Sequence, residues 1–153
     1  MKKTWLLCLI SLMAMIASAD PVTYRDASGK ITGSAAINSS ITTYRDTTGK
    51  IIGVAVQSGN SMTYRDATGK IIGEAMLNGC RVTYRNVSGS ISGGAVINGD
   101  QTTYMDSLGR IIGTSSVSGN QIICRDASGR ITGSVSDNSN IAILRNLFYR
   151  IKQ

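Results

Sequence analysis

A repeat of twenty residues, free of insertions, dominates this sequence. The segment TYRDTTGKIIGVA at residues 43–55 returns with small changes at 63–75, and related segments begin at residues 23, 83, 103 and 123. So regular a period indicates structural units that cannot bury their apolar residues alone and must pack on their neighbours. Three columns are identical in all six copies: Gly29, Gly49, Gly69, Gly89, Gly109 and Gly129; Ile31, Ile51, Ile71, Ile91, Ile111 and Ile131; and Gly33, Gly53, Gly73, Gly93, Gly113 and Gly133.

Each unit reads as two short strands and two tight turns. After the β-rich segment TTYRD, Gly49 stands where a type I turn with a glycine bulge needs a left-handed residue. Asp46, at the start of that turn, is suited to accept a hydrogen bond from the backbone two residues on. The second strand is IIGVAVQ, and Gly59 follows it where a second turn needs a positive φ. Because both connections have hairpin length, we expect an all-β fold with antiparallel successive strands.

Two arrangements of six to seven such units compete. One is an antiparallel meander that coils or rolls on itself, and the other is a β-solenoid whose coils stack in parallel. In a solenoid, Arg25, Arg45 and Arg65 would stack about 4.8 Å apart, and like charges directly opposed destabilise a sheet. A meander places another strand between them. The sequence therefore favours the meander, with the solenoid as the alternative.

The turn chemistry also predicts a register. Asp46 would pair with Lys50, Arg45 would face Ile51, and Tyr44 would face Ile52. The surface that carries the constant isoleucine, glycine and alanine would then pack inward, with the tyrosine on the other surface. A slip of one residue, which the pattern leaves open, would bring the tyrosine inward too. The mid-strand glycine of each unit indicates a bend or a close backbone approach.

The two ends of the chain differ from the array. Residues 1–19 combine a basic start, an apolar run and a small-residue cleavage signal, which predicts a secretory signal peptide removed before Asp20. We therefore expect an exported protein of the periplasm, the cell surface or the medium. The repeat array would span residues 20–137, and residues 138–153 would form a degenerate capping segment. Helical spacing of apolar residues in that segment leaves an amphipathic helix that contacts a membrane or partner as an alternative.

Catalytic chemistry is not expected. The chain has no histidine, which excludes Ser-His-Asp and Cys-His catalysis and removes the commonest metal ligand. Each repeated aspartate stands at the start of a turn. A calcium site requires several oxygen ligands that converge, and the repeat unit does not supply them. We predict no enzyme, no cofactor and no metal. Cys80 and Cys124 occupy different columns of the repeat, so we expect them to lie beyond disulfide reach.

The adjacent aromatic and basic columns are the candidate binding site. In the structural interpretation, tyrosine covers isoleucine across the strands, and arginine pairs with aspartate or faces solvent. In the functional interpretation, the two columns form a periodic surface for envelope polysaccharide or another surface component. Nucleic acid is not expected, because the basic residues recur singly and mostly beside an aspartate. The candidate surface-binding residues are Tyr24, Arg25, Tyr44, Arg45, Tyr64, Arg65, Tyr84 and Arg85.

The segments YRDASGKI and YRDASGR resemble the bacterial RHS/YD hairpin repeats over about residues 22–137. The resemblance rests on Tyr24, Asp26, Gly29 and Lys30 and their counterparts, and Arg25 is an insertion relative to the family's motif. It implies a β-sheet scaffold exposed outside the cell, here without the family's enclosed toxin cargo. We therefore expect an exported structural or adhesive repeat protein with a surface-interaction role. A self-assembling, curli-like fibre subunit, and hence a homo-oligomer, is the alternative.

Overall fold

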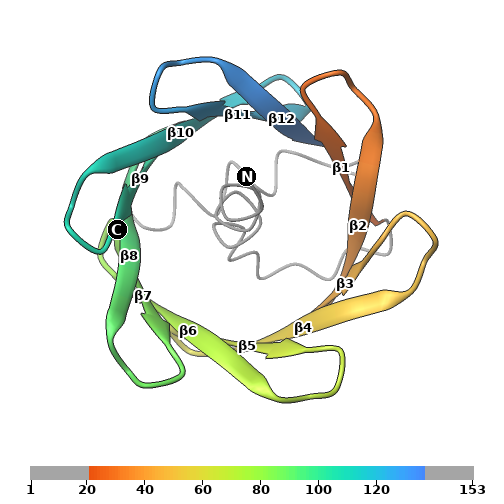
Figure 1. Ribbon diagram of the computed structural model, residues 1–153, viewed down its shortest axis with the longest axis vertical. Coiled ribbons are helices and arrows are strands. Elements are labelled where there is room, and N and C mark those ends of the chain that lie inside the picture. The colour runs from red at the N-terminus through yellow and green to blue at the C-terminus, as the bar shows by residue number, and fades with distance from the viewer. Residues whose placement is uncertain (1–20, 137–153) are drawn as a thin grey trace.

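The computed structural model describes residues 21–136, which form a closed barrel of twelve antiparallel strands connected as a meander (Figure 1). The predicted all-β meander with two strands per unit is confirmed. The solenoid is wrong, and the expected rolling is confirmed in part, because the sheet closes completely when β1 pairs with β12. The strands are β1 (Val22–Asp26), β2 (Ile31–Asn38), β3 (Ile41–Arg45), β4 (Ile51–Ser58), β5 (Ser61–Asp66), β6 (Ile71–Asn78), β7 (Arg81–Asn86), β8 (Ile91–Asn98), β9 (Gln101–Asp106), β10 (Ile111–Ser118), β11 (Gln121–Asp126) and β12 (Ile131–Ser136).

The expected signal peptide and capping segment lie outside the described residues. Within residues 21–136 no helix is long and apolar enough to span a membrane.

The seam of the barrel repeats the register of its internal junctions. Val135 of β12 pairs with Tyr24 of β1 just as Ala35 of β2 pairs with Tyr44 of β3. Val22 pairs with Ala35, and Ala35 pairs on its other side with Tyr44. The pairing therefore shifts by two residues along the strands with each repeat unit. A regular stagger of this kind tilts the strands of a closed sheet by roughly 35–45°. Six units therefore close the ring with the same pairing at every junction.

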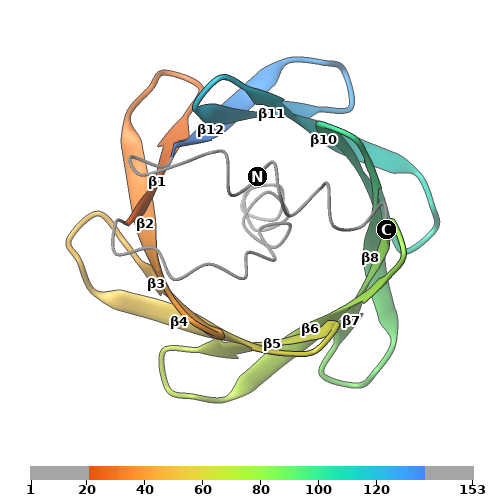
Figure 2. The ribbon, with the colours of Figure 1, turned by 180° about the vertical axis from the view of Figure 1, so that it is seen from behind.

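A bulge in each unit changes the register predicted from the sequence. The Asp46 N–H donates to the Lys50 carbonyl at 3.0 Å, and Arg45 pairs with Ile51, as predicted. The register then shifts, and Tyr44 pairs with Gly53. The predicted Tyr44–Ile52 pair is therefore wrong, because Ile52 is the extra residue of a bulge, which bends and twists the strand. Beyond the bulges, the six hairpin loops splay outward from the ring (Figures 1 and 2).

The bulge also decides which side chains form the core. It places Tyr44 on the same face as Gly53 and Ala55, and this face is buried in every unit. Ala55 is fully buried, whereas Ile51 is 39% exposed and Ile52 is 51% exposed. The constant isoleucine is therefore exposed on the outer face, and the prediction that it packs inward is wrong. The tyrosine is inward, as the one-residue slip that the sequence left open would place it, but the shift is local to the bulge and leaves the Arg45–Ile51 pair in register.

The local turn chemistry is confirmed. Gly49 has a φ of +84° and its N–H donates to the Asp46 carbonyl at 3.1 Å, as a type I turn with a glycine bulge requires. The Asp46 carboxylate accepts hydrogen bonds from the N–H and hydroxyl groups of Thr48 at 2.8 and 2.7 Å. At the opposite end of the strands, Gly59 has a φ of +57°. A positive φ at the first of two central residues is typical of a type II′ hairpin turn.

The mid-strand glycine marks a close backbone approach. A Cβ placed on Gly53 would lie 2.8 Å from the Arg65 carbonyl oxygen of the neighbouring strand. The corresponding distances at four equivalent glycines are between 2.5 and 2.7 Å. The predicted close approach is thus confirmed, and it stands next to the bulge where each hairpin turns outward. The four glycines are Gly33, Gly73, Gly93 and Gly113.

Candidate functional site

The structure separates the tyrosine and arginine columns onto opposite faces of the sheet. Tyr24, Tyr64 and Tyr84 belong to the core and are 4–8% exposed, and Tyr44 is half-buried. Side chains of consecutive strand residues point to opposite faces, so each adjoining arginine lies on the other side. Arg25, Arg45, Arg65 and Arg85 are all half-buried there. The eight residues therefore form two sets rather than the single aromatic and cationic surface considered from the sequence.

The tyrosine face lines the barrel interior. Burial raises the pKa of Tyr64 well above its ordinary value, and three other tyrosines, including Tyr24, raise it further. Because the sheet is closed, its buried face is the face that points into the barrel. Burial likewise raises the pKa of Tyr44 to about 12.

Each arginine of the outer column holds its own hairpin loop. The Arg45 guanidinium donates to the Gly49 carbonyl at 2.9 Å, and the same bond recurs in four other units at 2.7–3.0 Å. The structural interpretation had the arginine paired with aspartate or facing solvent, and the structure shows arginine–carbonyl bonds. In the fifth unit Met105 replaces the arginine, and Arg110 pairs with Asp106 at 2.7 Å. This is the one ion pair among residues 21–136.

The loop aspartates are held ionised by the turns that they cap. A hydrogen bond from the Thr48 hydroxyl lowers the pKa of Asp46 from 3.8, with smaller contributions from the N–H groups of Thr48 and Lys50. Asn86 occupies the same position in its unit and accepts the equivalent bonds from Ser88 and Ser90. The carboxylate is therefore replaceable in the turn by a neutral amide. Its first role is to cap the loop.

Charge is concentrated at one end of the barrel. We name the hairpin rim as the six loops that join β1 to β2, β3 to β4, β5 to β6, β7 to β8, β9 to β10 and β11 to β12, together with the residues that flank them: the arginine column, the turn aspartates and the constant isoleucines. It contains ten basic and five acidic side chains, a net charge of +5, whereas the remaining charged residues in 21–136 are Glu74, Arg81 and Asp100. Sequence reasoning missed this segregation of charge. The sequence does carry a signal for it, since the basic residues of the rim stand at the same two positions of the repeat unit.

The hairpin rim also exposes apolar side chains. The constant isoleucine of each unit stands directly opposite the arginine position in the sheet, so the two share a face. Each of the six isoleucines is between 39% and 57% exposed. The rim therefore combines basic groups with a ring of exposed isoleucines, namely Ile31, Ile51, Ile71, Ile91, Ile111 and Ile131.

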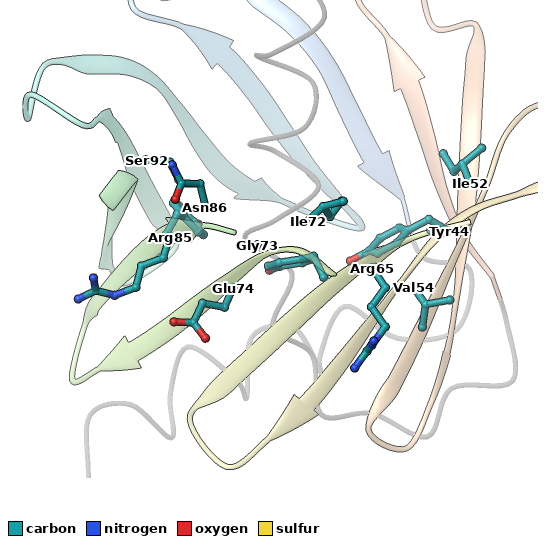
Figure 3. Close-up of a pocket in the computed structure, with 13 residues that line it drawn as sticks. Tyr44, Ile52, Val54, Arg65, Ile72, Gly73, Glu74, Arg85, Asn86 and Ser92 are labelled. Atoms are coloured by element: carbon teal, nitrogen blue, oxygen red, sulfur yellow. The ribbon is translucent and has the colours of Figure 1, made fainter. Parts of the chain in front are cut away.

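A cavity of about 310 Å³ lies beside the hairpin rim, in the sector of β3 to β8 (Figure 3). Tyr44, Tyr64, Tyr84, Ile52 and Ile72 line it together with the charged residues Arg65, Glu74 and Arg85. It was missed from the sequence because the tyrosines were expected on the outer face.

No other cluster in the described chain suggests a cofactor or metal. Cys80 is free and exposed, so it forms no bridge to the buried Cys124. Between residues 21 and 136 no three histidine, cysteine, aspartate or glutamate side chains are grouped so as to hold a metal ion. No family model, curated protein or solved structure matches this chain. The resemblance to RHS/YD repeats therefore stays a prediction.

Proposed function

We propose that this protein is an exported, non-catalytic surface-interaction protein that binds an anionic polysaccharide of the cell envelope through its hairpin rim. The observation that supports the proposal is the segregation of charge. The rim carries a net charge of +5, and the rest of the described chain carries one basic and two acidic residues. An anionic chain is therefore attracted to one end of the barrel and not to the other.

The basic groups of the rim are free to bind. Lys30, Lys50 and Lys70 make no ion pair among the described residues. Arg45 uses one guanidinium N–H for the Gly49 carbonyl, and a guanidinium has five N–H donors. An exposed ion pair contributes only about 0.2–1 kcal/mol. Repetition around the ring compensates, because a polymer that contacts several loops at once binds with avidity.

The fibre alternative has less support. Every strand from β1 to β12 has two neighbours in the closed barrel, and an unpaired edge strand is what templates the addition of another chain. The resemblance to RHS/YD repeats, which implies a scaffold outside the cell, is in keeping with a surface-interaction role. We expect purified mature protein to stay thioflavin-negative on prolonged incubation.

Binding to a polyuronate tests the proposal. We expect the mature protein, starting at Asp20, to bind immobilised alginate and not neutral dextran, with an affinity that falls as salt screens the charges. The triple variant Lys30→Gln, Lys50→Gln, Lys70→Gln should bind roughly tenfold more weakly. Arg81→Gln is the matched control, because it removes a basic residue from the opposite end of the barrel. Equal binding to alginate and dextran, or an equal loss in both variants, would exclude the rim as the site.

A further inference from the structure

The tips of two neighbouring hairpin loops expose large apolar side chains. Val87, in the loop from β7 to β8, is 67% exposed, and Leu108, in the loop from β9 to β10, is 75% exposed. No other large apolar side chain among residues 21–136 is as exposed. The two loops are adjacent, because β8 pairs with β9, and both project from the ring (Figure 1). We name these two loops the apolar sector of the hairpin rim.

Leu108 stands at a position where the other five units have a hydroxyl. In those units the hydroxyl bonds to the side chain of the turn aspartate or asparagine at 2.6–2.7 Å. Leu108 lacks this bond, and only its N–H donates to the Asp106 carboxylate. The leucine therefore omits a hydrogen bond of the turn and places an apolar side chain in water. Neither change stabilises the fold, which points to a role in binding. The five hydroxyl residues are Ser28, Thr48, Thr68, Ser88 and Ser128.

The apolar sector also carries less charge than the rest of the rim. Ser90 replaces the lysine or arginine that ends every other loop, and Met105 replaces the arginine of the outer column. Arg110 is paired with Asp106 inside the sector. The neighbouring loops, from β5 to β6 and from β11 to β12, each have two basic rim residues. The rim therefore presents apolar tips between basic flanks.

We propose that the apolar sector inserts its two tips into the surface of an anionic lipid bilayer, while the basic loops on either side contact the lipid headgroups. Binding to a membrane surface combines buried apolar side chains with attraction between basic residues and anionic lipids, and this part of the rim supplies both. A protein partner is a poorer match, because two separate side chains on projecting loops fall short of the roughly 1,200–2,000 Å² that a stable protein interface buries. The inference goes beyond polysaccharide binding, which has no use for Val87 or Leu108.

Co-sedimentation with lipid vesicles tests the proposal. The mature protein should bind vesicles of phosphatidylglycerol and phosphatidylcholine roughly tenfold or more tightly than vesicles of phosphatidylcholine alone, and salt should weaken the binding. Leu108→Ser should keep the fold, because the other units have a hydroxyl there, and should weaken binding to the anionic vesicles about fivefold or more.

Ile41→Gln is the matched control for the loss of an exposed apolar side chain. Ile41 is 45% exposed at the opposite end of the barrel, and Gln101 and Gln121 occupy the same column of the repeat. This variant should bind the anionic vesicles as the wild type does. Circular dichroism of both variants checks that the barrel is folded.

A tryptophan at the loop tip reports insertion directly. Leu108→Trp gives the mature chain its only tryptophan, because the one tryptophan of the sequence is Trp5. Its emission should shift to the blue with anionic vesicles and should not shift with alginate, so membrane binding and polysaccharide binding can fail separately. The proposal is overturned by any of three results: equal or no binding of the wild type to the two kinds of vesicle, equal losses in Leu108→Ser and Ile41→Gln, or an emission of Leu108→Trp that anionic vesicles leave unchanged.

Discussion

Alanine substitution at two adjacent glycines of β8 is expected to change the stability of the protein very differently. A Cβ on Gly93 would lie 2.7 Å from the Met105 carbonyl oxygen, which is closer than real Cβ contacts come. The obstacle is backbone of the next strand, so the sheet itself must shift. Overpacking of this kind costs about 1–3 kcal/mol. All six units keep glycine in this column.

Gly94 is the matched control in the same strand. Its added Cβ would lie 3.0 Å from the Val82 carbonyl oxygen, but the other five units accommodate a side chain in this column: Ser34, Val54, Glu74, Thr114 and Ser134. The sheet therefore has an arrangement that admits a Cβ there. Because replacing glycine also restricts the unfolded chain, Gly94→Ala should change the free energy of unfolding by less than about 1 kcal/mol, or increase it.

Thermal unfolding followed by circular dichroism measures the difference. For a domain of about this size, 1 kcal/mol corresponds to a shift in Tm of roughly 4 °C. We expect Gly93→Ala to lower the Tm by about 4–12 °C and Gly94→Ala to leave it within about 4 °C of the wild type. Equal shifts in the two variants would refute the argument that the close approach fixes the glycine column.

Three further predictions concern the loops and the interior. Hydrogen bonds lower the pKa of Asp46 from 3.8, so the stability that the loop aspartates contribute should be complete above about pH 4 and lost as the pH falls further. Melts recorded at several pH values should show this loss of stability. Asp46→Asn should make the loss smaller, because Asn86 already makes the same bonds in its own unit. Burial raises the pKa of Tyr44 to about 12, so stability should be complete below about pH 10 and fall at higher pH; phenolate absorbance at 295 nm should rise together with unfolding and not before it. Arg45→Ala removes one exposed hydrogen bond to a loop carbonyl and should cost about 0.5 kcal/mol in urea unfolding, and a cost as large as that of Gly93→Ala would show that the arginine has a larger structural role.

The strands and turns were predictable because their causes are local. Gly49 and Asp46 stand in one turn, and the φ and hydrogen bonds that they require are determined within five residues of chain. The antiparallel order followed from the short connections. The inward position of the tyrosines could not be predicted from the sequence, because it depends on the bulge at Ile52. A bulge is an extra residue on one of two paired strands, so it becomes visible only when both strands are aligned.

Closure and the binding sites depend on longer-range geometry. The seam pairs Val135 with Tyr24, residues more than a hundred positions apart, through a stagger that accumulates over all six units. A period of twenty does not reveal how many units complete a ring. The charged rim was missed, although assigning alternate turns to opposite ends of the strands would have shown it in the sequence. The cavity could not be found in this way, because it depends on the inward position of Tyr44 and its counterparts.

The most direct test of the account is to map where an anionic polysaccharide contacts the barrel. Backbone amide shifts in NMR, recorded while alginate is added, have built-in reporters, because both ends of the barrel carry glycines in their turns. The account predicts shift changes at the glycines of the hairpin rim, such as Gly29, Gly49 and Gly69, and none at those of the opposite turns, such as Gly59 and Gly99. Changes confined to the opposite turns, or no change at either end, would contradict it.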